Sequence, residues 1–401
     1  MMKKRIYIFL EYYYPKSQRI SAQLISELAD QISQYDNEVF IIVPDPDIKF
    51  PYEVKNINNQ KVVFFRSPDT KVQNRVLRAL SEIILSFTAY ICLRGFVRKK
   101  PPGYLICLSP TIFYGPYLSF LCKKHKIKNY LILRDIFPQW AVEVGLIKEN
   151  GLVHRFFKYF EEWNYKAATE IGLEAPSILK QFNERHPHHT HKTELLFNWV
   201  KESSSKHKKK ISLRERYELE KKIIFFYGGN IGIAQDVPNI IRLADNMREA
   251  NNIAFVILGH GTEREKISNL IRERDLDDIV VFAEGVNQEI FMDYISEIDI
   301  GLITLNRKNK GHNIPGKVLN YSRMGIPILG SVNPNNDIID IINKNDAGIV
   351  VENGNDQAFK EAATNFLDVK VRKMKSEGSK SLVNKIFNVE RASKKILDKI
   401  S

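Results

Sequence analysis

Short apolar runs rich in β-branched and aromatic residues alternate with helix-length segments along most of this sequence. In the first half such runs occur at 5–13, 37–45 and 129–138, and residues 21–32 carry apolar side chains at helical spacing. The same alternation continues from 222 to 353. Parallel strands need crossover connections, which are usually helices, so this order favours parallel sheets covered by helices. The sequence therefore predicts an α/β fold with two doubly wound domains in tandem.

A lysine-rich polar segment separates the two blocks of alternation. Residues 201–221 have no apolar stripe before Ile211, and we interpret them as a linker. This linker divides a first domain at 1–200 from a second domain at 222–385, and residues 386–401 form a further amphipathic helix. With 401 residues, 44% of them hydrophobic, the chain is long enough to bury two cores.

The formal net charge of +13 indicates partners that carry negative charge. Phosphorylated substrates and anionic lipid both satisfy it, whereas the sequence lacks the aromatic and basic motifs of nucleic-acid-binding modules, so we expect no nucleic acid partner. The three cysteines, Cys92, Cys107 and Cys122, have no metal-binding or redox spacing and are expected to be reduced thiols of a cytoplasmic protein. Residues 1–5 lead directly into an expected strand, so no signal peptide is expected.

The longest apolar stretch, 79–96, contains Glu82 and Arg94. It is shorter than the roughly 20 uninterrupted apolar residues that a membrane-spanning helix needs. Basic residues follow it at 98–100. A helix with one apolar side and a basic end suits contact with the inner face of a cell membrane. We expect mainly a core helix of the first domain, and peripheral membrane contact is the alternative.

Residues 311–330 read as a polar loop, a helix and a buried strand. Pro315 is expected to be the first residue of the helix, which runs to about Met324 and is capped by Gly325. Lys317 then lies in the first turn, where the positive end of the helix dipole favours an acid rather than a base. We interpret Lys317 as the counter-charge of an anionic ligand at this helix end. A solvated surface lysine explains the local sequence equally well.

Three glycine-containing turns follow strands in the second half, at 227–232, 259–266 and 283–288. Glycine lets backbone approach a phosphate closely. The first turn has Asn230 at the second glycine position of a dinucleotide-binding motif, and it lacks the lysine of a Walker loop. All three turns and the 311–330 segment are expected at one edge of one sheet. Ligands of such sheets bind outside the carboxyl ends of the strands, so a cleft between two facing domains is expected.

Arg134 and Asp135 follow an expected strand of the first domain and point to substrate positioning or proton transfer. A local ion pair that caps the next helix is the alternative. The histidine tract at 186–191 is expected to be a solvated loop, because no cysteine or carboxylate cluster joins it. Asp45 and Asp47 lie in a proline-containing turn where aspartate is common, so no metal site is expected.

Six motifs occur along the chain in this order: YYYP, RDIFPQWAVEVGL, FNWV, FYGGNIGIAQ, LGHGTEREKI and IPGKVLNYSRMGIPIL. Together they resemble bacterial glycosyltransferases of family 4. The sequence is especially similar to the branch that builds O-antigen and capsule repeat units, including N-acetylfucosamine-type sugar transferases. The resemblance implies the GT-B fold, with two Rossmann-like domains, and a last helix that packs back on the first. It also implies that a sugar is transferred with retention, without a metal ion or a cofactor. The donor would be a nucleotide-diphosphate-sugar bound to the second domain, and the acceptor would be a lipid-linked or other saccharide bound to the first domain.

The residues that match the site of this family depart from its pattern. The paired glutamates of the family fall on His312 and Asn320, and its arginine and lysine beside the diphosphate fall on Asn230 and Gln235. Each lost cation would contribute about 1.5–3 kcal/mol as a charge-assisted hydrogen bond. An active enzyme would then depend on helix N-termini and Lys317. The resemblance thus implies Arg134, Asp135 and His312 as catalytic candidates, and Gly229, Asn230, Gly232, Gln235, Gly259, Val286, Pro315, Gly316, Lys317 and Asn320 as donor-binding candidates.

Two alternatives remain open from the sequence. The departures are compatible with a non-catalytic partner subunit of a related transferase. A sugar-nucleotide epimerase on the same fold would need acid and base side chains, for which His312 and Asp135 are the candidates.

Overall fold

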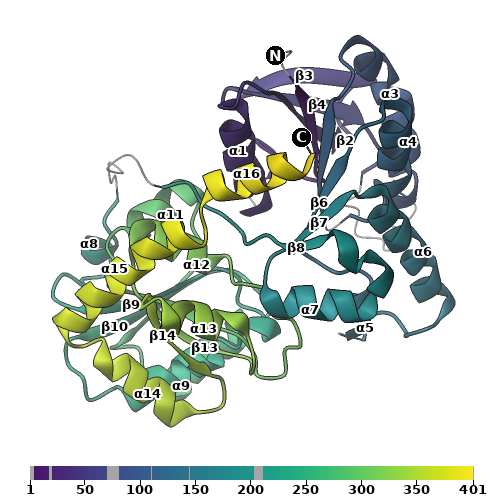
Figure 1. The fold of residues 1–401 in the computed structure, drawn as a ribbon. Coiled ribbons are helices and arrows are strands. Elements are labelled where there is room, and N and C mark those ends of the chain that lie inside the picture. The colour runs from purple at the N-terminus through teal and green to yellow at the C-terminus, as the bar shows by residue number, and fades with distance from the viewer. Residues whose placement is uncertain are drawn as a thin grey trace. The chain divides into compact units, whose positions relative to one another are not determined.

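The computed structural model describes residues 4–17, 20–69, 81–109, 111–143, 145–202 and 211–400. The chain divides into two compact units (Figure 1). The first unit comprises Met1–Asn198 together with Val389–Ser401, and the second comprises Trp199–Asn388. Each unit is built around its own sheet, which confirms the predicted α/β fold with parallel sheets.

The first unit contains an eight-stranded sheet in the order β3-β4-β2-β1-β5-β6-β7-β8. Its central strands are buried along nearly their whole length, as expected for a sheet covered on both faces. The strands are β1 (Arg5–Phe9), β2 (Glu38–Asp45), β3 (Tyr52–Ile57), β4 (Gln60–Arg66), β5 (Tyr104–Leu108), β6 (Asn129–Leu133), β7 (Glu170–Leu173) and β8 (Thr193–Leu195).

The edge strand β3 pairs antiparallel with β4, whereas the other pairs of this sheet are parallel. The sequence analysis did not predict this hairpin. Its turn contains Asn58 and Asn59, whose φ angles are 51° and 63°. Two consecutive residues with positive φ are typical of the tight turns that join antiparallel strands, and asparagine tolerates this conformation better than most residues.

Helices cover both faces of the first sheet (Figure 1). On one face, α1 (Ile20–Ser33) contacts α16 (Val389–Ile400), whose Ile396 and Ile400 are fully buried. On the other face lie α3 (Leu85–Lys99), α4 (Gly115–His125) and α6 (Leu152–Ala167). Further helices are α5 (Gln139–Glu143), α7 (Pro176–Arg185) and the 3-10 helix η1 (Pro187–Lys192).

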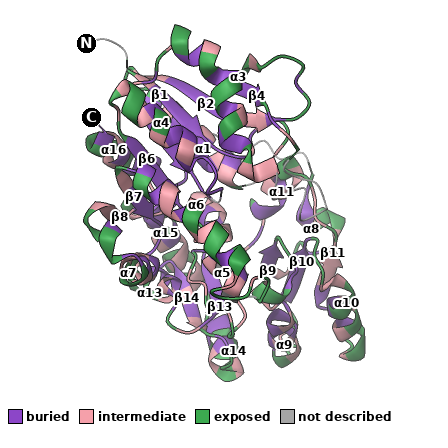
Figure 2. Ribbon diagram, turned by 90° about the vertical axis from the view of Figure 1, so that its right-hand side faces the viewer, coloured by how far each residue is buried: buried purple, intermediate pink, exposed green. Residues whose placement is uncertain are grey.

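The second unit contains a six-stranded parallel sheet in the order β11-β10-β9-β12-β13-β14. A cluster of buried aliphatic and aromatic side chains packs α9, α10 and α14 on one face, and α12 packs against α15. Figure 2 shows the strands as the buried layer of this unit. The strands are β9 (Ile223–Gly228), β10 (Ile253–Leu258), β11 (Val280–Ala283), β12 (Ile300–Thr304), β13 (Ile328–Val332) and β14 (Gly348–Glu352). The helices are α8 (Leu213–Arg216), η2 (Ile233–Gln235), α9 (Pro238–Asn246), α10 (Arg264–Glu273), α11 (Gln288–Ile295), α12 (Lys317–Met324), α13 (Asp337–Lys344), α14 (Asp356–Asn365) and α15 (Val369–Lys385).

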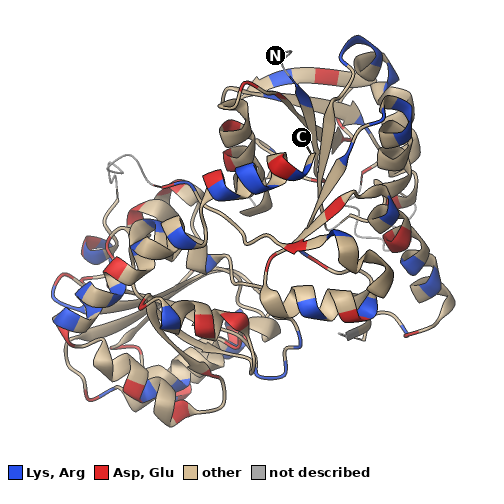
Figure 3. Cartoon of the chain, in the orientation of Figure 1, with Lys and Arg blue, Asp and Glu red and all other residues tan. Residues whose placement is uncertain are grey.

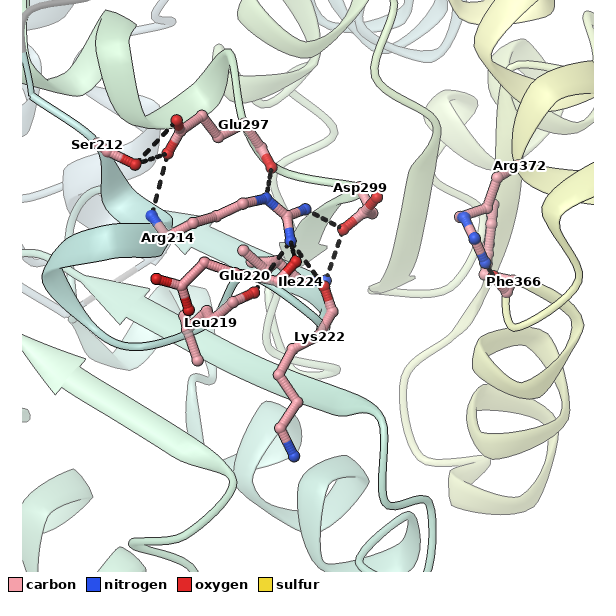
Figure 4. A network of polar contacts seen from close by, with 10 residues as sticks. All are labelled: Ser212, Arg214, Leu219, Glu220, Lys222, Ile224, Glu297, Asp299, Phe366 and Arg372. Carbon is pink, nitrogen blue, oxygen red and sulfur yellow. Dashed lines mark hydrogen bonds and ion pairs between the residues drawn. The ribbon is translucent and has the colours of Figure 1, made fainter.

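Arg214 attaches the segment before β9 to the second unit (Figure 4). Its guanidinium donates to the Asp299 carboxylate at 2.7 Å and to the carbonyl oxygens of Leu219 and Lys222 at 3.0 and 2.8 Å. The Glu297 carboxylate accepts from the Arg214 backbone N–H at 3.0 Å. Part of the segment that we predicted as a linker is therefore folded onto this unit. Residues 203–210 of that segment lie outside the described residues.

Candidate functional site

The carboxyl ends of β9 and β10 approach each other through backbone atoms. The Gly229 N–H donates to the Leu258 carbonyl at 2.9 Å, and the Ile231 N–H donates to the His260 carbonyl at 2.8 Å. A Cβ atom on Gly259 would lie 1.8 Å from the Gly229 carbonyl oxygen. Only glycine fits this position, so the two glycine turns predicted from the sequence form one compact platform.

Lys317 reaches this platform from the first turn of α12. The helix begins at Lys317 after Gly316 and is capped by Gly325 in the left-handed conformation, so it starts two residues later than we predicted from Pro315. The Lys317 ammonium lies 4.4 Å from the centre of the Tyr227 ring, at the end of β9. A Cβ on Gly229 would lie 3.2 Å from the same nitrogen. The lysine therefore lies directly beside the glycine turn.

The Lys317 charge has no carboxylate partner among the residues that the structure describes. As a residue Lys317 is half-buried, but protein surrounds its ammonium, and this burial lowers the pKa of Lys317 to about 8. Burial without a counter-ion disfavours the charged form, and an opposite charge within a few ångström restores it. A cation in this state, in the first turn of a helix, is suited to bind an anion.

Asn230 and Gln235, which we predicted at the positions of two family cations, bind each other. The Asn230 side-chain amide donates to the Gln235 side-chain oxygen at 2.7 Å. A Cβ on Gly232 would lie 2.9 Å from the Asn230 amide nitrogen and 3.1 Å from the Gln235 oxygen. These three predicted residues are thus brought together, and they form a neutral patch rather than a positively charged one.

His312 is fixed by the loop that follows β13. Its Nδ1 lies 3.0 Å from the Asn335 carbonyl oxygen, which can only accept, so Nδ1 donates in this contact and Nε2 is left for another partner. The Asn333 side chain donates to the carbonyl oxygens of Asn309 and Gly311, at 3.1 Å each, and so holds the loop that leads to α12. His312 remains a catalytic candidate on the evidence of its position alone.

The remaining predicted donor-binding residues lie in loops or helix starts at the same edge of this sheet. Val286 lies in the loop after β11, next to Gly285. A Cβ on Gly285 would lie 2.7 Å from the His260 ring. Pro315 and Gly316 precede α12, and Asn320 is one helical turn beyond Lys317. This arrangement is the one that parallel strand order predicts.

Sequence reasoning missed the side chains that join these loops. Asn353, which is buried, donates to the Leu305 carbonyl at 2.7 Å and to the Asp236 carboxylate at 2.8 Å. The Asn306 N–H donates to the Ala234 carbonyl at 2.9 Å. Asn353 and Asn306 closely follow the strands β14 and β12, and only this position after apolar runs could have indicated them.

In the first unit, Arg134 and Asp135 follow β6, as predicted. The backbone N–H of Arg134 donates to the Ser109 hydroxyl at 2.8 Å. Burial lowers the pKa of the Arg134 guanidinium, and the nearby Glu174 carboxylate opposes that shift. Asp135 is exposed as a residue, but its carboxyl is partly enclosed by protein. This burial raises the pKa of the carboxyl, and Arg134 opposes the rise. Buried Glu174 accepts from the Asn198 side chain at 2.6 Å, and the sequence analysis identified neither residue.

Two features that we set aside have structural explanations. Lys16 bridges the carboxylates of Asp45 and Asp47 at 2.6 Å each. The histidine tract is not a solvated loop throughout, because His186 stacks on Phe182 and is buried, as is His189.

Within the described ranges, no group of three or more histidine, cysteine or acidic residues is placed to hold a metal ion. No helix in that part of the chain is long and apolar enough to cross a membrane.

Two doubly wound α/β units of this kind define the GT-B fold, and the chain is similar over nearly its whole length to solved GT-B structures. Sucrose-phosphate synthase from Thermosynechococcus elongatus is 12% identical, with a TM-score of 0.68 and coverage of 99% of this chain and 98% of that one. The glycosyltransferase WaaG, involved in lipopolysaccharide biosynthesis, is 13% identical, with a TM-score of 0.62 and 99% coverage of both chains. Anabaena HepE in complex with UDP and glucose is 11% identical, with a TM-score of 0.66 and 98% coverage of both.

Sequence comparison identifies the family of the second unit. Residues 209–381 match the family Glycosyl transferases group 1, so this unit is a group 1 glycosyltransferase domain. Curated relatives include the putative colanic acid biosynthesis glycosyl transferase WcaI of Escherichia coli (strain K12), 24% identical over 192 residues, which are 46% of each chain. Another is the probable glycosyltransferase WbjE of Pseudomonas aeruginosa, 22% identical over 297 residues, which are 71% of this chain and 70% of WbjE. The matched region thus spans less than half the length of WcaI.

Proposed function

We propose that this protein transfers a sugar from a nucleotide-diphosphate-sugar to a lipid-linked or saccharide acceptor in the synthesis of bacterial surface polysaccharide, such as O-antigen or capsule. The observation that carries the proposal is the buried Lys317 ammonium, which lies beside the Gly229 turn without a carboxylate partner in the described part of the chain. The names of WcaI and of WaaG, which refer to colanic acid and lipopolysaccharide, support the polysaccharide class. HepE was solved with UDP and glucose, which supports a nucleotide-sugar donor.

In the proposed mechanism the second unit stabilises the departing diphosphate. Transfer of a sugar releases a nucleoside diphosphate, and charge develops on the oxygen that leaves. Lys317 and the N-terminal end of α12 supply positive potential at that point, so the protein itself stabilises the leaving diphosphate in a metal-independent reaction. Asn320 would hydrogen-bond a hydroxyl of the donor, without the charge of the family's glutamate.

We propose that the first unit binds the acceptor, with Arg134 and Asp135 as the residues that position it. Both follow β6 at the edge where ligands of doubly wound sheets bind. His312 is proposed to contact the donor sugar through Nε2, because its Nδ1 is occupied by the Asn335 carbonyl. Transfer with retention, and a donor sugar of the hexose or N-acetylhexosamine type such as N-acetylfucosamine, are the finer parts of this proposal.

A non-catalytic partner of a related transferase is the second candidate. It is favoured by one observation, the neutral Asn230–Gln235 hydrogen bond where the family has two cations. Such a protein would bind a nucleotide-sugar without turning it over. Release of nucleoside diphosphate from a bound donor, with and without a polyprenyl-linked saccharide acceptor, separates the two functions.

Thermal-shift measurements with UDP-, GDP- and dTDP-sugars test the donor site. We expect one nucleotide class to raise the unfolding temperature and Lys317→Met to remove most of that rise. Lys360→Met is the matched control, because Lys360 is an exposed lysine on α14 in the same unit. An equal rise in the wild type and in Lys317→Met would exclude Lys317 from the site, and no rise with any of the three would contradict the proposed donor class.

A further inference from the structure

Exposed apolar side chains are concentrated on one helical layer of the first unit. More than half of the large apolar side chains that are exposed in the described residues belong to α3, α4, α6 or the segments just before them. Phe87 is 64% exposed and Leu152 is 86% exposed. We call this set the α3/α4/α6 face: Ile84, Phe87, Tyr90, Ile91, Phe120, Leu146, Leu152, Val153, Phe156 and Tyr159.

On α3 these side chains form a stripe that becomes basic toward the end of the helix. Ile84, Phe87, Ile91, Arg94 and Arg98 follow one another at spacings of three and four residues, and all are exposed. Residues at this spacing lie on one side of an α-helix. The first three are apolar and the last two are arginines, so the outward side of α3 is amphipathic along its length.

An aromatic contact extends this stripe onto α4. The rings of Tyr90 and Phe120 meet edge to face, with centroids 5.0 Å apart. Lys123 and Lys124 follow Phe120 at three and four residues and are exposed, and the Lys124 ammonium lies 5.4 Å from the Phe120 ring. The sequences of α3 and α4 contain basic residues and neither aspartate nor glutamate. Figure 3 shows Lys and Arg along these helices.

The exposed side of α6 continues the layer. Gly115 at the start of α4 packs against α6. A Cβ on Gly115 would lie 2.7 Å from the Asn164 backbone nitrogen. Leu152, Phe156 and Tyr159 lie at spacings of four and three residues and are exposed. Of the two acidic residues of α6, Glu161 is buried and accepts from the Tyr165 hydroxyl at 2.9 Å, whereas Glu162 is partly exposed and lies 3.1 Å from the His189 ring nitrogen. The exposed part of α6 thus presents mainly apolar groups.

We propose that the α3/α4/α6 face binds the surface of a bilayer that contains anionic lipid. Aromatic and aliphatic side chains would enter the interface between headgroups and acyl chains, while Arg94, Arg98, Lys123 and Lys124 contact lipid phosphates. Charge complementarity decides between this partner and a second copy of the chain. The four cations of this face have no ion pair with any residue that the structure describes, and self-association through the face would bring these like charges together. The inference rests on surface residues of one unit and does not depend on the proposed activity.

Flotation of the full-length chain with lipid vesicles tests this inference. We expect binding to vesicles of phosphatidylcholine mixed with an equal part of phosphatidylglycerol, and much weaker binding to phosphatidylcholine alone. Removal of two charges in Arg94→Gln/Arg98→Gln should weaken binding by about fivefold for each charge. Phe87→Ser/Leu152→Ser should weaken it by roughly tenfold or more for each side chain, because the loss of an inserted apolar group is larger.

Matched surface variants make the test specific to this face. Phe50→Ser removes an apolar side chain that is 68% exposed outside it, and Lys180→Gln removes an exposed cation on α7. Both should bind vesicles as the wild type does. No flotation with the mixed vesicles, or equal losses in the face and control variants, would overturn the inference. So would light scattering that shows a dimer which Phe87→Ser/Leu152→Ser converts to a monomer, since the face would then belong to a second copy.

Discussion

The Lys317 ammonium lies over the ring of Tyr227, 4.4 Å from its centre. The face of an aromatic ring attracts a cation, and such a contact contributes about 0.5–2 kcal/mol. Burial acts in the opposite direction, because it lowers the pKa of Lys317 from 10.5 to about 8. The ring thus holds the ammonium in position while leaving it short of negative charge. An anionic ligand would complete the pair.

Replacement of the buried cation should stabilise the ligand-free protein. We expect Lys317→Met to raise the free energy of unfolding of the second unit by about 1–3 kcal/mol at neutral pH, because it removes a charge buried without a counter-ion but keeps an apolar chain. Urea denaturation measures the change. Lys360→Met should alter stability by less than about 0.5 kcal/mol. A destabilised Lys317→Met would mean that the ammonium is already compensated in the free protein.

The lowered pKa of Lys317 also predicts how ligand affinity depends on pH. In the unfolded chain the pKa of this lysine returns to 10.5. Between about pH 8 and pH 10.5 the unfolded state therefore binds more protons than the folded state. The burial penalty is therefore complete below about pH 8 and is relieved as pH rises toward 10.5. A bound diphosphate requires the protonated form, so its affinity should fall as pH rises through about 8. Calorimetric titration with the nucleoside diphosphate of the responsive class measures this, and a profile shared with Lys317→Met would contradict it.

Tyr227 has two separable roles. Its hydroxyl donates to the Asn230 carbonyl at 2.6 Å, and its ring contacts Lys317. We expect Tyr227→Phe to lose about 0.5–1.5 kcal/mol of stability for the hydrogen bond while ligand affinity remains near that of the wild type. Tyr227→Leu should also lose the cation contact and lower affinity. Parallel denaturation and calorimetry on the two variants distinguish the roles, and equal affinities would remove the ring from the site.

The order of strands and helices and the position of the glycine turns were predictable because both follow from local pattern. Lys317 was identified because its charge conflicts with a helix start. Tyr227 was not identified from the sequence, because there it resembles the other apolar residues at strand ends. Its role depends on β12 lying next to β9, which places α12 over that end. The β3–β4 hairpin and the buried Asn353 were missed for a similar reason, because pairing and buried polar contacts are set by distant residues.

The close approach of the β9 and β10 turns gives a steric prediction. A side chain on Gly259 would collide with the Gly229 carbonyl oxygen at 1.8 Å, which is backbone and cannot rotate away. We expect Gly259→Ala to displace the turn and abolish nucleotide-dependent stabilisation, and to destabilise the second unit by about 2 kcal/mol or more. Gly311→Ala is the control, because its Cβ would meet only side-chain oxygens at 3.7 and 3.9 Å. Similar nucleotide responses in the two variants would contradict this account of the platform.

Arg214 should be the residue on which attachment of the 211–222 segment depends most. Its side chain binds the Asp299 carboxylate and backbone carbonyl oxygens together, and it is 23% exposed. Arg214→Leu would leave these acceptors without their donor and should cost about 3–5 kcal/mol. Arg214→Lys keeps the charge but not the planar set of donors, so we expect about half of that loss.

A neighbouring arginine provides the control for this experiment. The Arg216 guanidinium donates to the Tyr294 hydroxyl at 2.9 Å and lies 5.6 Å from the centre of the Tyr217 ring. Arg216→Lys should therefore change the free energy of unfolding by no more than about 1 kcal/mol. Urea denaturation of the Arg214 and Arg216 variants should be combined with nucleotide titration at low denaturant, because Arg214 is expected to act on folding and not on the ligand. Equal losses at the two positions would show that the segment is held by other contacts than the Arg214 network.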